Sequence, residues 1–204
     1  MLLNKITSIF LLTFLLFGCD KNQPPLKPLS NNAVILAFGD SLTYGTGAAR
    51  GKSYPEVLSQ LTGHPVINAG IPGEISAEGL QRLPALLDRH QPELLILTHG
   101  ANDILRKLPL QTMQDNLEKM LLLAQQRQIQ VLMLGVPEFN LFSLNSAPLY
   151  AELAVRYGIP IELELLPDIL SQRALKSDTV HPNQAGYQQM AEGIFISLQS
   201  AGAL

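Results

Sequence analysis

The sequence predicts an α/β fold built on a parallel β-sheet, and two observations lead to this prediction: the alternation of segment types and the composition. Short, almost continuously apolar segments alternate along the chain with longer amphipathic segments, which is the order of βαβ units. The composition agrees with a single folded domain. Of the 204 residues, 47% are hydrophobic and 15% are charged, so the chain is not intrinsically disordered.

Five segments are predicted to be strands because they are short and apolar, as are strands that helices cover on both faces. They are residues 33–38, 66–68, 94–97, 131–134 and, with the weakest pattern, 159–163. Helices are predicted where apolar residues recur every three or four positions, as Leu80, Leu83 and Leu87 do. These helices cover residues 54–61, 77–89, 110–127, 148–157 and 184–198.

The first 18 residues are interpreted as an export signal. Lys5 is followed by a 12-residue apolar stretch, residues 6–17, which is shorter than the roughly 20 residues of a membrane-spanning helix. Cys19, the only cysteine, comes next, and its surroundings resemble a bacterial lipobox, whose cysteine is lipidated and becomes the mature N-terminus. An ordinary secretory signal with an incidental cysteine, or a buried cysteine, remains an alternative.

Residues 20–32 contain three prolines and show no hydrophobic periodicity, so we expect them to form a semi-rigid tether. The folded domain is then expected to span residues 33–204. Together with Cys19, this organisation predicts a lipid-anchored protein of the bacterial cell envelope that faces the periplasm or the exterior.

Polar residues and glycines follow the predicted strands at the edge where parallel sheets bind ligands. Ser41 follows the first strand, Gly73 the second and Asn102 the third, while Asp178 and His181 precede the last helix. A serine becomes a good nucleophile when a histidine takes its proton and a carboxylate orients that histidine. The N–H groups of Ser41 and Gly73 and the Asn102 amide are candidate oxyanion donors. Taken alone, Ser41 is more typical of a helix N-cap, and it is the convergence of these segments that favours a nucleophile.

The segments that carry these residues resemble the four blocks of the GDSL/SGNH hydrolase family. The blocks are Gly-Asp-Ser-Leu at 39–42, Asn-Ala…Pro-Gly-Glu-Ile-Ser at 68–76, Gly-Ala-Asn-Asp at 100–103 and Asp-x-x-His-Pro at 178–182. Residues 79–87 are similar to the branch that includes multifunctional thioesterase I/lysophospholipase and bacterial arylesterases. The resemblance implies a flavodoxin-like, three-layer α/β/α sandwich with a five-stranded parallel sheet.

The resemblance also implies roles for individual residues. Ser41 is the nucleophile, His181 the base and Asp178 its orienting carboxylate, and Ser41, Gly73 and Asn102 form the oxyanion hole. Asp103 is expected to brace the loop or to cap a helix rather than to react.

In the thioesterase I branch the loop after the fourth strand borders the acyl groove, so Phe139, Leu141 and Phe142 are expected to contact substrate. The alternative is a loop that packs on the core.

Two positions depart from the family pattern: Ala101 replaces a glycine, and Thr179 stands where glycine is frequent. If position 101 had a positive φ, alanine there would cost about 1 kcal/mol.

We therefore expect a monomeric serine hydrolase that cleaves carboxylic esters or thioesters of short-to-medium acyl chains through an acyl-enzyme on Ser41. A carbohydrate O-acetylesterase of the cell envelope and a non-catalytic binding lipoprotein remain alternatives.

No metal or other cofactor is expected, because His, Asp and Glu do not cluster at metal-binding spacing. Net charge of −3, without a basic cluster, gives no reason to expect nucleic acid. The expected partners are small substrates and, through Cys19, a membrane.

Overall fold

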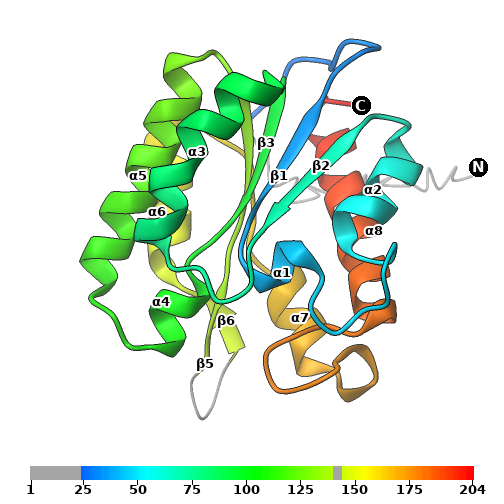
Figure 1. The fold of residues 1–204 in the computed structure, drawn as a ribbon, viewed down its shortest axis with the longest axis vertical. Helices are drawn as coiled ribbons and strands as arrows, with labels where there is room; N and C mark the ends of the chain where they lie inside the picture. Colours follow the sequence, from blue (N-terminus) through cyan, green and yellow to red (C-terminus); the bar gives the residue numbers. More distant parts are fainter. Residues whose placement is uncertain (1–23, 140–143) are drawn as a thin grey trace, which may run out of the picture.

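The structure, a computed structural model, describes residues 24–139 and 144–204. Its centre is a parallel sheet of five strands in the order β2-β1-β3-β4-β7 (Figure 1). The strands are β1 (Ile35–Gly39), β2 (Val66–Gly70), β3 (Leu94–Thr98), β4 (Gln130–Leu134) and β7 (Ile161–Glu162). The strand order reverses direction after β1, so the carboxyl ends of β1 and β3 flank the crevice in which such sheets bind ligands.

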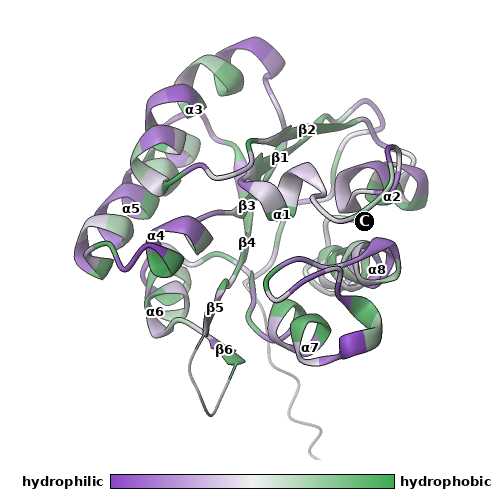
Figure 2. Cartoon of the chain, turned by 60° about the horizontal axis from the view of Figure 1, so that its bottom comes forward, coloured by the Kyte–Doolittle hydropathy of each residue, from purple (hydrophilic) through white to green (hydrophobic). Residues whose placement is uncertain are grey.

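Helices cover both faces of the sheet and complete three layers (Figures 1 and 2). One layer holds α3 (Ser76–His90), α5 (Leu110–Gln126) and α6 (Pro148–Tyr157); the other holds α2 (Tyr54–Thr62), α7 (Leu165–Ser171) and α8 (Gln184–Ser200). Two short helices, α1 (Ser41–Tyr44) and α4 (Ala101–Leu105), lie at the carboxyl edge of the sheet. A hairpin of β5 (Pro137–Phe139) and β6 (Leu144–Ser146) and a 3₁₀ turn (Arg173–Leu175) complete the described elements.

The hydrophobic core lies on the two faces of the central strands. Every residue of β1 and β3 is buried, because a helical layer covers each face of the sheet. Among the largest fully buried side chains are three tyrosines, Tyr54, Tyr150 and Tyr187. The Tyr150 hydroxyl donates to the backbone oxygen of His99 at 2.7 Å, so a buried polar group helps to fix the end of β3.

The predicted fold class is confirmed, and the five predicted strands are the five strands of the sheet. Each of the five predicted helices is also present, with ends that differ by two residues at most. The sequence did not predict α1, α4, α7 or the hairpin. These elements are seven residues long or shorter, so they contain too few turns or alternations to produce a periodic pattern.

The N-terminal boundary predicted at Ala33 is corrected by the structure. The N–H of Leu26 donates to the carbonyl of Ala201 at 2.7 Å, and that of Leu29 donates to Ala203 at 2.9 Å. Ser30 bonds to the carboxylate of Glu93, just before β3. The folded unit therefore reaches back at least to Leu26, and residues 26–30 are docked at the amino edge of the sheet, at the top of Figure 1.

The predicted signal at residues 1–18 and the lipidation site at Cys19 lie outside the described residues. Across residues 24–139 and 144–204, no helix has the length and apolar character needed to cross a membrane.

Candidate active site

The sequence-predicted residues converge at the carboxyl edge of the sheet. Ser41, Gly73, Asn102 and His181 all line one pocket of about 230 Å³, and Asp178 contacts His181. The pocket is bounded by the loops after β1, β2, β3 and β4 and by the loop before α8. Five separate segments therefore meet there, as expected for the edge where α/β sheets bind ligands.

Ser41 is placed by the abrupt end of β1. Asp40 is the N-cap of α1, and its Oδ1 accepts the Leu42 N–H at 3.0 Å, so Ser41 is the first helical residue and not the cap. A Cβ at Gly39 would collide with the backbone oxygen of Thr98, so glycine is needed where β1 ends against β3. The N–H of a residue at the first helical position has no intrahelical partner. The geometry thus presents both the hydroxyl and the N–H of Ser41 near the pocket.

His181 lies between Ser41 and Asp178 in a continuous chain of hydrogen bonds. Its Nε2 is 3.0 Å from Ser41 Oγ, and its Nδ1 is 2.8 Å from Asp178 Oδ2. The other carboxylate oxygen of Asp178 accepts the N–H groups of Val180 and His181, each at 2.8 Å. A turn closed by the Ser177 N–H, which donates to the His181 carbonyl at 3.0 Å, supports this arrangement.

The electrostatics of Asp178 match an orienting role. Burial raises the pKa of its carboxyl, but hydrogen bonds from His181 and from the Val180 N–H outweigh this and hold the pKa below its usual value. Asp178 is therefore ionised at neutral pH, and its Oδ2 accepts a hydrogen bond from the Nδ1–H group of His181. The imidazole tautomer with hydrogen on Nδ1 leaves Nε2 as an acceptor for the Ser41 hydroxyl.

Gly73 is presented by a type II turn over residues 71–74. The Glu74 N–H donates to the Ile71 carbonyl at 3.2 Å, Pro72 occupies the second position, and Gly73 has a φ of 81° at the third. The carbonyl of Gly73 accepts from Arg106 Nη2 at 2.7 Å, which holds the turn from its exposed side.

Asn102 lies on α4 and reaches the same turn. Its Nδ2 donates to the Glu74 carbonyl at 3.0 Å. A side-chain amide has two N–H donors, so one remains for an oxyanion after this bond is made. Asn102 and the Gly73 turn are therefore physically linked as well as adjacent to the pocket.

The Ala101 departure from the family pattern is accommodated. The positive φ of this loop, 110°, falls on Gly100, where a Cβ would lie 2.7 Å from Met113 Sδ and Tyr150 Oη. Ala101 is the first residue of α4 and has an ordinary helical backbone. The expected cost at position 101 therefore does not arise.

Asp103 braces the site from behind, as predicted. Its carboxylate accepts the Ser76 N–H at 2.8 Å and the Ser76 hydroxyl at 2.6 Å. This pair links the first turn of α3 to α4 and leaves no reacting role for Asp103.

The apolar wall of the pocket contains residues that the sequence did not predict. Leu105, Val136, Leu170 and Val180 line it, alongside Pro72 and Pro137. Leu141 and Phe142, predicted to contact substrate, lie outside the described residues, as does the side chain of Phe139. Val136 and Pro137 belong to the same loop, so part of the predicted acyl-binding segment borders the pocket.

Sequence reasoning also missed the contacts of three charged or ionisable side chains behind the pocket, Glu74, Arg82 and His99. The sequence offers one weak signal, the charged residue Arg82 inside the amphipathic pattern of α3.

Comparisons with known proteins find similar chains and folds. A model of the GDSL-like Lipase/Acylhydrolase family matches residues 37–189. An arylesterase of Vibrio mimicus is 30% identical over 78% of this chain and 84% of its own length. The thioesterase 1/protease 1/lysophospholipase L1 of Escherichia coli (strain K12) is 28% identical over 81% of this chain and 83% of its own length. A crystal structure of TesA superposes with a TM-score of 0.71 at 27% identity, over 82% of this chain and 99% of that one.

Proposed function

The chain belongs to the GDSL-like lipase/acylhydrolase family, and from this premise we propose that Ser41, His181 and Asp178 are its catalytic triad. The enzyme is a carboxylic ester hydrolase of the serine type. The observation that carries the residue assignment is the hydrogen-bond chain from Ser41 Oγ to His181 Nε2, 3.0 Å, and from His181 Nδ1 to Asp178, 2.8 Å. Three residues from two distant segments meet in the order that nucleophilic catalysis requires.

The reaction follows from this order of groups. Ser41 Oγ attacks the carbonyl carbon while His181 Nε2 takes the hydroxyl proton, and the carbonyl electron pair moves onto oxygen. The oxyanion is received by the N–H groups of Ser41 and Gly73 and by the free N–H of Asn102. When the bond to the leaving oxygen or sulfur breaks, His181 returns its proton to the leaving group.

The acyl group then remains bonded to Ser41 as an ester. A water molecule attacks this ester while His181 again accepts a proton, and collapse of the second tetrahedral intermediate releases the carboxylic acid. The proton passes from His181 back to Ser41 Oγ, so the enzyme returns to its starting state. Asp178 stays ionised throughout and stabilises the imidazolium that forms in each half-reaction.

A covalent label tests the assignment of the nucleophile. A p-nitrophenyl alkylphosphonate, which phosphonylates activated serines, should add one phosphonyl group to the protein, and peptide mass spectrometry should place it on Ser41. Ser41→Ala should take up no label and should retain less than about a thousandth of the wild-type kcat, because little remains beyond oxyanion binding. Label on another serine, or an active Ser41→Ala protein, would refute the proposal.

We propose that the substrates are esters or thioesters of short-to-medium acyl chains. The support is the wall of Leu105, Val136, Leu170 and Val180, which gives an alkyl chain apolar contacts beside the reacting serine. A relative is named thioesterase 1/protease 1/lysophospholipase L1, which also suggests acyl substrates. Phe139, Leu141 and Phe142 are proposed to extend this wall. Such a wall offers few hydrogen-bond partners to a sugar, so an O-acetylated carbohydrate is the less favoured substrate.

We also propose that the protein is a monomer anchored in the bacterial cell envelope by lipid on Cys19. The support for the anchor is the lipobox-like sequence and the 18 residues before it.

A further inference from the structure

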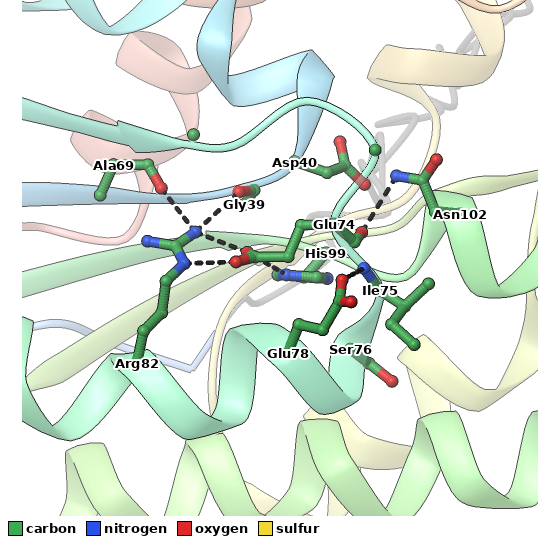
Figure 3. Close-up of polar contacts among 12 residues, drawn as sticks. Gly39, Asp40, Ala69, Glu74, Ile75, Ser76, Glu78, Arg82, His99 and Asn102 are labelled. Atoms are coloured by element: carbon green, nitrogen blue, oxygen red, sulfur yellow. Dashed lines mark hydrogen bonds and ion pairs between the residues drawn. The ribbon is translucent and has the colours of Figure 1, made fainter.

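Behind the pocket, Glu74 and Arg82 form a largely buried ion pair (Figure 3). Arg82 Nε donates to Glu74 Oε1 and Nη2 to Oε2, both at 2.6 Å, and the Glu74 side chain is 5% exposed. His99, which is fully buried, places Nε2 3.0 Å from Glu74 Oε2. A two-point contact of this kind fixes the direction of the carboxylate as well as its position.

The same guanidinium is bonded to the ends of two strands. Arg82 Nη2 donates to the Ala69 carbonyl in β2 at 2.8 Å and lies 3.1 Å from the Gly39 carbonyl at the end of β1. Its Cζ atom lies over the ring of Phe38, 4.1 Å from the centroid. Arg82 therefore fixes Glu74 relative to the strand end that leads directly to Asp40 and Ser41.

Glu74 is also the last residue of the turn that presents Gly73. Its backbone carbonyl accepts the Asn102 amide, while its carboxylate is held by Arg82 and His99. Glu74 thus touches or adjoins each element that carries a proposed oxyanion donor: the Gly73 turn, Asn102 on α4 and, through Arg82, the end of β1.

The packing around His99 shows that space is made for this arrangement. A Cβ at Gly79 would collide with the His99 ring, so α3 passes close to the imidazole only because it has glycine there. The Phe38 ring also packs near the imidazole, with ring centroids 5.7 Å apart and the ring planes tilted by 34°. His99 is held between a helix and a strand, with Nε2 directed at Glu74.

A buried ion pair is a poor means of stabilising a fold, because the cost of removing two charges from water offsets most of their attraction. Apolar side chains of similar volume would fill this space at least as favourably. What the charged pair adds is the fixed direction of its hydrogen bonds. These bonds hold Glu74, the last residue of the turn that presents Gly73.

We infer that Glu74, Arg82 and His99 are positioning residues that set the distance between the Gly73 turn, Asn102 and the Ser41 strand end. The inference rests on the proposed function, since the oxyanion hole is part of it. Disturbing the network should misplace donors that act on the transition state and so lower kcat with little effect on KM.

Two conservative variants test the inference, and an exposed pair supplies matched controls. Glu74→Gln removes the charge at constant shape, and Arg82→Lys keeps the charge but loses the forked contact. Asp88→Asn and Arg127→Lys make the same changes in an exposed pair 2.8 Å apart, with Asp88 on the same helix as Arg82. Each protein is assayed with p-nitrophenyl butyrate well below its melting temperature, with Ser41→Ala in parallel.

Glu74→Gln and Arg82→Lys should lower kcat about 10- to 100-fold and change KM by less than about threefold, as expected when catalytic donors are misplaced. The two control variants should stay within about twofold of wild type, because exposed pairs contribute little. Rates of phosphonylation by the alkylphosphonate should fall in parallel with kcat, since that reaction also places an oxygen in the oxyanion hole.

Two results would overturn the inference. If the Glu74 and Arg82 variants melt at lower temperature but keep wild-type kcat and KM, the network supports only the fold. If KM rises at constant kcat, it supports substrate binding. If Ser41→Ala is inactive, either of these results rejects only the positioning role of the network and leaves the proposed triad standing. If Ser41→Ala is active, the proposed triad itself is wrong.

Discussion

Asp178 holds His181 at two points: Oδ2 contacts the imidazole Nδ1, and Oδ1 accepts the backbone N–H of the same residue, each at 2.8 Å. The carboxylate therefore fixes both the ring and the chain that carries it. A change at Asp178 affects the tautomer of the base and also the turn on which the base stands.

Asp178→Asn should lower kcat by about 10²- to 10⁴-fold, because an amide N–H in place of Oδ2 favours the tautomer with hydrogen on Nε2, which cannot accept the Ser41 proton. KM should change little. The measurement is steady-state hydrolysis of p-nitrophenyl acetate, with Asp168→Asn, in α7, as the control. A variant within about tenfold of wild type would remove Asp178 from the triad.

Asn102→Ala should lower kcat by about 10²- to 10³-fold with a small change in KM, since the lost donor acts on the developing oxyanion. Asn145→Ala, at an exposed position in β6, is the control. If only KM changed, Asn102 would bind substrate without stabilising the transition state.

The stability of the protein should depend on pH through Glu74. Burial raises the pKa of this carboxyl, but hydrogen bonds from His99 and Arg82 outweigh this and hold the pKa below the ordinary 4.5. As the pH falls, the Glu74 carboxyl therefore takes up its proton at a higher pH in the unfolded chain than in the folded protein. The contribution of ionised Glu74 to the free energy of unfolding is complete above pH 4.5 and is lost as the pH falls through the lower pKa of the folded state.

Urea unfolding of wild type and Glu74→Gln at several pH values measures this contribution. The difference in unfolding free energy between the two proteins should shrink as the pH falls from about 6 to about 3. Asp88→Asn should show a smaller change, because solvent screens the exposed pair. A Glu74→Gln difference that is the same at every pH would show that the carboxylate is not preferentially ionised in the fold.

Activity should depend on acyl-chain length. Each CH₂ group that enters the apolar wall is worth about 0.8 kcal/mol, so kcat/KM should rise about fourfold per carbon until the wall is filled. Leu105→Ala, Phe139→Ala and Phe142→Ala should weaken eight-carbon esters more than acetate esters. Equal losses at two, four and eight carbons would show that these residues support the fold and do not select the substrate.

Cys19→Ala should release the protein from the membrane fraction without changing its specific activity, because the active site draws on residues from Ser41 onward. Fractionation of cells expressing each form, followed by an esterase assay, measures both properties. Membrane association that survives the substitution would contradict lipid anchoring at Cys19.

Much of this arrangement can be predicted from sequence because it is local. The strands β1 and β3 are continuous apolar runs, and Asp178 and His181 are three residues apart within one turn. The proposed catalytic residues lie in short motifs next to predicted strand ends, so the topology of a parallel sheet is enough to bring them to one edge.

The contacts of Arg82 could not be predicted, because they join segments that are distant along the chain. Arg82 bonds to Gly39, 43 residues away, and its pairing with Glu74 depends on how α3 packs against the sheet. The docking of Leu26 onto Ala201 is of the same kind, since no periodic pattern in a proline-containing segment predicts a partner near the other end of the chain.

That docked segment sets the orientation of the enzyme on a membrane under the proposed anchoring. Residues 26–30 attach at the amino edge of the sheet, whereas the pocket is lined by residues of α1 and α4 at the carboxyl edge, and these two helices lie in the lower half of Figure 1. A chain tethered through Cys19 leaves the domain on the side opposite to its active site. With such an anchor, the pocket would face the aqueous compartment, and dissolved acyl esters would reach it more directly than lipids of the leaflet that holds the anchor.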